Sequence, residues 1–451
     1  MGKILSIEVD NRNIKILEGT KKGSSLILHQ SIFLDMDPSI IDDGKIIDMD
    51  SIAEIIQVNL SQNKISSKKA IITINTNSII TRIIELPLLK KKSDTFSMIK
   101  NEIEQLISVD LNQYKLIYKK TETIVSEEGE LGKYLVYGLP VSMYDQYLEL
   151  AQRLKLDLIA LDLSFNSLDK ITEQKLTINK KALDKNTASV FISFGYDTIT
   201  FSVVNNGTNE FSRTLATGIK DMVRNFAAAF NIGHEEALSE INKLSLEESY
   251  DDFANVSMLN IAEDFINGWT DEFNRYIRYY NSTNKDKNQI SKIYIYGTSI
   301  NMKGLEDYLS SHLSLDVDTI REISSVSVKH SKNKADIDVK VYFNTILSLY
   351  IDRKSINFLT DKKKKHKSRF YIGILIMVLS LAVILRGALF LYSYFYNQSA
   401  LEKEIASIDE FIGKEENIKL NDQAENTKKT VALLEKYKKE TDKKITDIES
   451  N

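Results

Sequence analysis

One segment near the C-terminal end constrains the architecture of this 451-residue chain more than any other. Residues 370–396 form an apolar run with aromatic residues at both ends, and a basic cluster at 362–369 directly precedes it. A helix rises about 1.5 Å per residue, so roughly 20 apolar residues cross the hydrocarbon core of a bilayer. The run meets that length and lies too far along the chain for a signal peptide. The sequence therefore predicts a large body held to a membrane by a single-pass transmembrane helix.

The charges beside this run predict how it crosses the membrane. Basic residues next to a span stay on the cytoplasmic side, and each adds about 1 kcal/mol of attraction to an anionic leaflet. We therefore expect the N-terminal body in the cytoplasm, at the inner or plasma membrane, and the C-terminal tail outside. Arg386 lies within the run, past its middle. Either its side chain reaches the outer interface, or it contacts an acidic or polar residue of a partner helix.

The composition narrows the range of functions. The chain has no cysteine, which excludes disulfides, thiolate metal sites and cysteine nucleophiles. Its five histidines show no paired metal-ligand spacing, so we predict no metal site. The net charge is −4, and the basic density is local to the membrane flank, which argues against nucleic acid as a partner.

A strand–turn–strand–turn–strand pattern occurs twice in the body, at 3–34 and again at 189–214. Helical spacing of apolar residues follows each copy, first at 50–63 and later at 218–230, 233–243 and 256–280. Two meander-plus-helix halves with a cleft between them predict an α/β body with the two-lobed layout of the actin-like ATPase fold.

An αββαβ run interrupts the first half. It begins with a helix at 93–107, continues with two strands, and ends with a helix at 143–156 and a strand at 157–163. We predict the following boundaries: first lobe 1–84, continued at 163–188 and 335–352; inserted subdomain 85–162; second lobe 189–334; docking motif and basic linker 353–369; transmembrane helix 370–396; helical tail 397–451.

Several short motifs in the body resemble, in their order, a known family. Arg82–Pro87 resembles an R-x-I-x-L-P segment, and Phe211–Gly218 resembles an F-x-R-x-x-x-x-G strand and turn. Ile7–Lys15 and Phe194–Thr200 resemble two phosphate loops, and Tyr296–Leu305 resembles an adenosine loop. The body thus resembles PilM, the actin-like cytoplasmic protein of type IV pilus assembly, which is itself similar to the cell-division protein FtsA.

The C-terminal part resembles the start of PilN, a bitopic membrane protein of the same system. In that family an I-N-L-L-P-like peptide docks onto PilM and is followed by a basic stretch, one span and a coiled coil. Here Ile356-Asn357-Phe358-Leu359-Thr360 stands in that position. The resemblance implies a natural PilM–PilN fusion, although the chain ends too early for the usual PilN domain outside the membrane. We expect this peptide to dock, on its own body or on a neighbouring subunit; the alternative is a plain linker.

The family's nucleotide loops are altered in this sequence. Asp10 stands where the first loop has glycine, and like charges within about 4 Å repel by roughly 1–4 kcal/mol. Ser193 stands where the second loop has a metal-side aspartate, and Gly297-Thr298 replaces paired glycines. The resemblance implies nucleotide contacts at these positions: Glu8, Asp10, Asn11, Arg12, Lys15, Ser193, Gly195, Thr198, Gly297 and Thr298. The substitutions argue against ATP hydrolysis, and we assign neither a catalytic residue nor ATP or Mg²⁺ as a cofactor.

The tail carries a short heptad seam. Leu401, Ile405, Ile408 and Ile412 are spaced 4-3-4, as in a coiled coil, and shorter seams follow. Such seams are marginal alone, so the tail either pairs with a partner helix or is solvated and partly disordered.

These features and the resemblance together favour a membrane-anchored scaffold of the type IV pilus inner-membrane platform, linking cytoplasmic motor components to partners outside. The expected partners are a PilO-like protein through the tail, the assembly ATPase or platform protein through the body, membrane lipid, and further copies of the chain. The competing interpretation is an ATP-binding switch or filament-forming ATPase at the membrane, in a pilus, competence or type II secretion platform.

Overall fold

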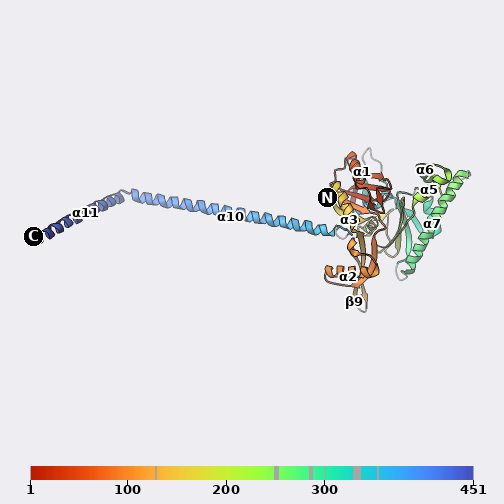
Figure 1. Cartoon of the computed structure of the whole chain (residues 1–451), viewed down its shortest axis with the longest axis horizontal. Coiled ribbons are helices and arrows are strands. Elements are labelled where there is room, and N and C mark those ends of the chain that lie inside the picture. Colours follow the sequence, from red (N-terminus) through yellow and green to blue (C-terminus); the bar gives the residue numbers. More distant parts are fainter. Residues whose placement is uncertain are drawn as a thin grey trace. The chain divides into compact units, whose positions relative to one another are not determined.

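The computed structural model describes residues 2–126, 129–247, 253–283, 288–299, 301–328, 337–352 and 355–449, with side chains omitted at 126, 253–254, 360–371 and 447–449. The chain divides into two units, Met1–Thr360 and Asp361–Asn451 (Figure 1). The side chains of the basic cluster and of Phe370 and Tyr371, the aromatic residues at the start of the apolar run, lie outside the described set.

The first lobe is built on a six-stranded sheet in the order β10-β6-β1-β2-β3-β18. Strands β1, β2 and β3 form an antiparallel meander. The tight turn Asp10–Arg12 reverses the chain between β1 and β2, and the amide of Asp10 donates to the carbonyl of Asn13 over 3.0 Å. The other three strands join in parallel. Helix α1 (Met49–Gln62) packs its apolar face on the sheet. The strands are β1 (Ile4–Val9), β2 (Asn13–Lys22), β3 (Ser25–Asp35), β6 (Lys69–Ile74), β10 (Asp157–Leu163) and β18 (Val326–Val328).

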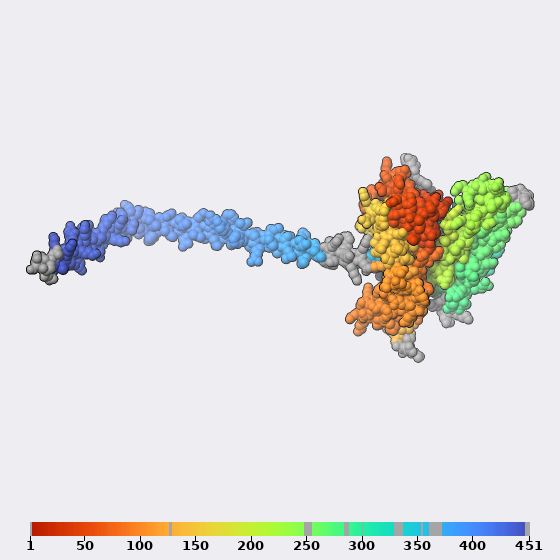
Figure 2. Space-filling model, in the orientation of Figure 1, coloured from red at the N-terminus to blue at the C-terminus, as the bar shows by residue number. Residues whose placement is uncertain are grey.

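The second lobe repeats this arrangement with a five-stranded sheet in the order β15-β14-β13-β16-β17. Its first three strands form the second antiparallel meander, and the last two join in parallel, so the repeated pattern expected from the sequence is confirmed. The strands are β13 (Ala188–Phe194), β14 (Ile199–Asn205), β15 (Thr208–Leu215), β16 (Ile290–Gly297) and β17 (Asp316–Thr319); the helices are α5 (Ile219–Phe230), α6 (His234–Lys243), α7 (Phe253–Thr283) and α8 (Leu305–Leu313). Figure 2 shows the two lobes of the first unit side by side, the first red to yellow and the second green.

The inserted region has the expected α–β–β–α–β order, but two sheets share its elements. β7 (Ile80–Pro87), β9 (Gly129–Pro140) and β8 (Tyr114–Ser126) form a separate antiparallel sheet, covered by α2 (Lys92–Leu106). Helix α3 (Val141–Arg153) packs instead in the core of the first lobe, and β10 pairs with β6. The expected grouping of the last helix and strand with the insert is therefore corrected, because β10 is apolar enough to extend the buried main sheet.

A buried helix joins the two lobes. α9 (Phe343–Ser348) lies within the segment 335–352, which the sequence assigns to the first lobe, and all of its side chains are buried. Phe343 lies against Phe191 of the second lobe, with ring centroids 6.2 Å apart, while Ser348 bonds to Ser6 of β1 over 2.6 Å. The remaining short elements of this unit are β4 (Ile41–Asp42), β5 (Lys45–Ile46), η1 (Leu111–Gln113), η2 (Ser164–Leu168), α4 (Asp169–Glu173), β11 (Thr177–Ile178) and β12 (Lys181–Ala182).

The second unit consists of two helices. α10 (Thr360–Gly413) contains the one stretch of the described residues, beginning at Ile372, that is long and apolar enough to cross a membrane. α11 (Glu415–Glu449) follows after a break at Lys414. The apolar seam at 401–412 lies within α10, so this part of the tail is helical, and the seam's side chains are exposed within this unit.

Candidate functional site

The two meander turns face one another across a narrow polar cavity. The cavity has a volume of about 20 Å³, and eight of the ten positions implied by the family's nucleotide loops line it: Glu8, Asp10, Lys15, Ser193, Gly195, Thr198, Gly297 and Thr298. The first strand of each meander, β1 or β13, ends at this cavity, so the turns that follow these two strands meet there. The structure brings these residues together; nucleotide binding there stays a prediction.

Glu8, at the end of β1 beside the first turn, is fully engaged by protein groups. Lys15 forms an ion pair with its carboxylate at 3.2 Å, and the hydroxyl of Thr345 donates to it over 2.7 Å. The side-chain amide of Asn344 adds a longer bond of 3.5 Å. Both Glu8 and Lys15 are buried. A buried charge needs such partners, and here α9 and β2 supply them.

Asp10 fills the space between the two turns. Its carboxylate accepts the backbone amide of Asn11 over 2.8 Å, and a Cβ built on Gly195 would lie 3.8 Å from its Oδ2 atom. Burial raises the pKa of Asp10, and the nearby Lys15 ammonium offsets part of that rise. A second anion in this space would meet both the carboxyl group and a cavity too small for it.

A chain of polar groups bridges the lobes beside this cavity. Tyr296 of β16 donates from its hydroxyl to the side-chain oxygen of Asn344 over 3.2 Å, and Asn344 in turn donates to Glu8 of β1. Burial raises the pKa of Tyr296, and hydrogen bonding to Asn344 and Ser193 counters that rise. Ser193 of the second loop therefore belongs to the hydrogen-bonded chain of side chains that joins the two lobes.

The end of β16 approaches the second meander closely. Gly297 has a φ of 126°, and a Cβ there would lie 2.2 Å from the carbonyl oxygen of Phe194, so only glycine fits. Thr298 follows, and its hydroxyl lies 3.2 Å from that of Ser299. The glycine is thus explained by close packing of two strands.

The larger interlobe cleft lies beside the small cavity and has a volume of about 860 Å³. Asn11 and Arg12 line it, although Asn11 also accepts the amide of Gly44 over 3.1 Å. The guanidinium of Arg12 lies 5.2 Å from the centre of the Tyr196 ring, a cation–π contact across the two turns. The sequence did not single out the cleft residues of the second lobe, which have no motif spacing of their own: Tyr196, Asp197, Lys220, Arg224, His234, Glu235, Asn242 and Ser299.

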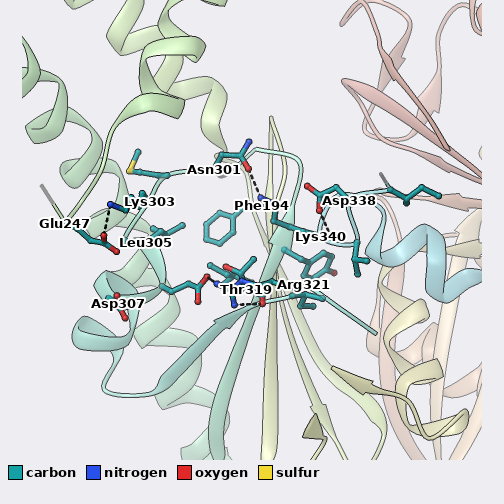
Figure 3. Close-up of a pocket in the computed structure, with 18 residues that line it drawn as sticks. Phe194, Glu247, Asn301, Lys303, Leu305, Asp307, Thr319, Arg321, Asp338 and Lys340 are labelled. Atoms are coloured by element: carbon teal, nitrogen blue, oxygen red, sulfur yellow. Dashed lines mark hydrogen bonds and ion pairs between the residues drawn. The ribbon is translucent and has the colours of Figure 1, made fainter. Parts of the chain in front are cut away.

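A third cavity of about 600 Å³ lies beside the loop after β16 (Figure 3). Its basic side chains already have partners: Lys303 pairs with Glu247 at 3.2 Å, Arg321 pairs with Glu306, and Lys340 donates to Asn301. Phe194 and Tyr296 line both this cavity and the small one, so the two cavities are adjacent. The basic side chains of this wall are thus already engaged by other protein groups.

The segment expected to dock lies against the open edge of the first lobe's sheet. The amide of Phe358 donates to the carbonyl of Leu161 in β10 over 2.9 Å. The side chain of Asn357 accepts the amide of Leu161 over 3.2 Å and donates to the carbonyl of Ile159 over 3.1 Å. A side-chain amide thereby substitutes for a strand residue on β10, the outermost strand.

Apolar side chains fix the same segment in the core. Ile356, Phe358 and Leu359 join the apolar cluster formed by α1, α3 and the first sheet, and Phe358 is completely buried. The structure thus has this segment on the chain's own body, one of the two arrangements left open by the sequence.

The repeated halves and their interlobe cleft define the class of protein as one with the actin-like ATPase fold. Three solved structures are similar to this chain at low identity. The "PilM-PilN type IV pilus biogenesis complex" has a TM-score of 0.64 and 15% identity, over 77% of this chain and 97% of that chain. The ethanolamine utilization protein EutJ from Carboxydothermus hydrogenoformans has a TM-score of 0.46 and 10% identity, over 77% and 89%. MreB 5 of Spiroplasma citri bound to AMPPNP has a TM-score of 0.42 and 9% identity, over 81% and 98%.

The sequence itself defines the family. A profile described as "Type IV pilus assembly protein PilM" matches residues 6–346, three quarters of the chain. The chain therefore belongs to the PilM family of type IV pilus assembly proteins, as its motifs predicted. A comparison with curated protein sequences gives no match.

Proposed function

We propose that this protein is a membrane-anchored scaffold of the type IV pilus assembly platform, with a body that does not turn over ATP. One observation carries the proposal: the segment that covers β10 continues directly into α10, which contains the apolar stretch. Because Phe358 and Leu359 are core residues, the actin-like body ends in a structural attachment to its own anchor. A scaffold requires a permanent attachment of this kind.

The state of the loops supports a scaffold over an enzyme. Catalysis of phosphoryl transfer needs carboxylates that hold Mg²⁺ and backbone amides that approach the phosphates. Glu8 is committed to Lys15 and Thr345, and Asp10 occupies the space between the turns. The hydrogen-bonded bridge through Asn344 joins the lobes with protein groups alone.

The alternative is a nucleotide-binding switch, and the interlobe cleft favours it. A volume of about 860 Å³ falls in the range of ligand sites, and Arg12, Lys220 and Arg224 line it. Lys220 is paired with Asp197 at 3.0 Å, however, and Arg224 with Asp221 at 3.0 Å.

Calorimetric titration with Mg-ATP separates the two functions. The body, residues 1–361, should show no binding tighter than high micromolar and no steady phosphate release. Asp10→Gly combined with Ser193→Asp should strengthen binding, because the pair removes a buried carboxyl and restores a metal-side one. Low-micromolar affinity of the unaltered body would favour the switch.

Reporter fusions test the membrane anchor and its orientation. A reporter that is active only outside the cytoplasm should work when fused after Asn451 and fail when fused before Met1, since the basic flank stays inside. Deleting 362–367 should weaken or scramble this orientation. Reporter activity at Met1 alone, or at both ends, would refute the proposed membrane anchoring and orientation.

The partners we propose follow from the same arrangement. The similar solved structure is a PilM–PilN complex, whereas this chain carries a PilM-like body and a docked segment in one polypeptide. We propose that the exposed seam at 401–412 pairs with a PilO-like platform protein and that the body contacts the assembly ATPase or platform protein. Co-purification with the tail deleted after residue 397 should lose the first partner and keep the second.

A further inference from the structure

Apolar and basic side chains gather at the start of α2, on the inserted subdomain. Leu89 and Phe96 are 37% and 38% exposed, and Lys90–Lys92 stand exposed between them. The ion pairs of the described residues include that of Lys100 with Glu104, about two and three turns beyond Lys92 on the same helix, but none of them involves the three lysines. We call Leu89–Lys92 and Phe96 the α2 patch; in Figure 2 the inserted subdomain that carries it is the orange lower part of the first unit.

The backbone of this patch is held in place by hydrogen bonds. The amide of Leu88 donates to the carbonyl of Glu130 in β9 over 3.1 Å, and the amide of Thr95 donates to that of Lys91 over 3.2 Å. The Tyr118 hydroxyl donates to the carbonyl of Lys92, and its ring lies 6.3 Å from that of Phe96. The side chains therefore project from a fixed turn rather than from a loose loop.

The anchor limits how far the body can move from a bilayer. Leu359 is buried in the first lobe, and the apolar stretch begins at Ile372. The thirteen steps between them span about 20 Å as a helix and at most about 45 Å fully extended. A membrane-anchored body of this kind always has a leaflet within reach of its surface.

We propose that the α2 patch contacts the anionic leaflet beside the anchor, with Leu89 and Phe96 at the headgroup boundary and the lysines on lipid phosphates. This inference rests on the proposed membrane anchoring. Exposed apolar side chains flanked by lysines are the pattern of an interfacial contact, and each lysine near an anionic surface strengthens binding roughly fivefold. Tethering adds a high effective concentration, so a small patch suffices.

The order of the lysines and apolar side chains along the α2 patch favours lipid over a protein as its partner. Protein interfaces favour aromatic residues and arginine at their centre and are depleted in lysine. The α2 patch instead places three consecutive lysines between its two apolar side chains. Asp94 is the acidic residue of this turn, and the Ser93 hydroxyl donates to it over 3.0 Å.

The test uses the full chain, whose lack of cysteine permits a single label. Ser93→Cys, beside the patch, carries an environment-sensitive NBD fluorophore, and the matched control is Val58→Cys on α1, which is 43% exposed. Both proteins are placed in nanodiscs of phosphatidylcholine alone or with phosphatidylglycerol. The label at 93 should shift to the blue and resist iodide quenching only in anionic discs, and the label at 58 should not change.

Lysine variants complete the test. K90Q/K91Q/K92Q should lower occupancy of the anionic leaflet by up to about a hundredfold, whereas K64Q/K68Q/K69Q, with the same charge change elsewhere, should leave it intact. A water-like label at 93 in anionic discs, or a shift that survives the first triple variant, overturns the inference. A shift in detergent that grows with protein concentration would mean a contact between copies and also overturns it. Failure of the chain to enter nanodiscs would refute the anchoring itself.

Discussion

Replacing Phe358 by alanine should release the segment that ties the body to its anchor. Burying three apolar side chains and forming three hydrogen bonds to β10 gives about 10 kcal/mol, whereas ordering five residues costs about 7 kcal/mol. The segment is therefore held by only about 3 kcal/mol. A fully buried Phe→Ala change removes about that amount or more, so the segment should be largely detached in the variant.

Hydrogen exchange measures this release directly. In a chain that ends at Asp361, exchange should rise by about a hundredfold in 355–359 and also in β10, because the amide of Leu161 loses its bond to Asn357. The matched control is Phe96→Ala, a half-exposed phenylalanine of the inserted subdomain, which should change neither region. Unchanged exchange at both places would reduce the segment to a linker. A fall in oligomer mass along with the exchange would mean that the segment docks on a neighbouring copy in solution.

Three further predictions concern single side chains. Asn357→Ala should cost about 1–3 kcal/mol of docking, seen by the same exchange measurement, because Leu161 and Ile159 each lose a partner. Burial raises the pKa of Asp162 to about 7, so the protonated carboxyl stabilises the fold below about pH 4 and that stability is lost as the pH rises towards 7. Asp162→Asn should flatten this pH dependence in thermal unfolding, and an unchanged slope would contradict the assignment. Lys15→Met should destabilise the body by about 3–5 kcal/mol in urea unfolding, since it leaves Glu8 buried with no cation beside it.

The fold could largely be predicted because its strongest signals are local. Alternating apolar residues and a short polar turn specify each meander, and 372–396 specifies a spanning helix by length alone. The sheet that each strand joins was harder to predict. The residues of β10 read as a strand, but only its pairing with β6 shows that it extends the main sheet. α9 is buried on every side, so its sequence lacks the one-sided periodicity that defines a helix boundary.

The candidate site was predictable only in part, for a related reason. The turn residues could be found because each lies at a fixed offset from a strand end. Their partners could not: Asn344 and Glu8 are 336 residues apart, and nothing near Asn344 marks it as a hydrogen-bonding bridge. The small cavity volume likewise depends on how Asp10 and Gly195 meet across two sheets, which no single segment encodes.

The bridge through Asn344 bears on what holds the two lobes together. In an actin-like nucleotide enzyme, phosphates and a cation would lie between the two turns and attract both lobes. Here Glu8, Asn344 and Tyr296 make the equivalent connection with protein atoms, and the buried helix α9 packs between the sheets. A connection of this kind does not depend on ligand concentration, because no partner has to bind. The lobes should therefore keep their relative position with or without nucleotide, and small-angle scattering of the body should not change when Mg-ATP is added; a compaction on addition would show that the cleft still closes on a ligand.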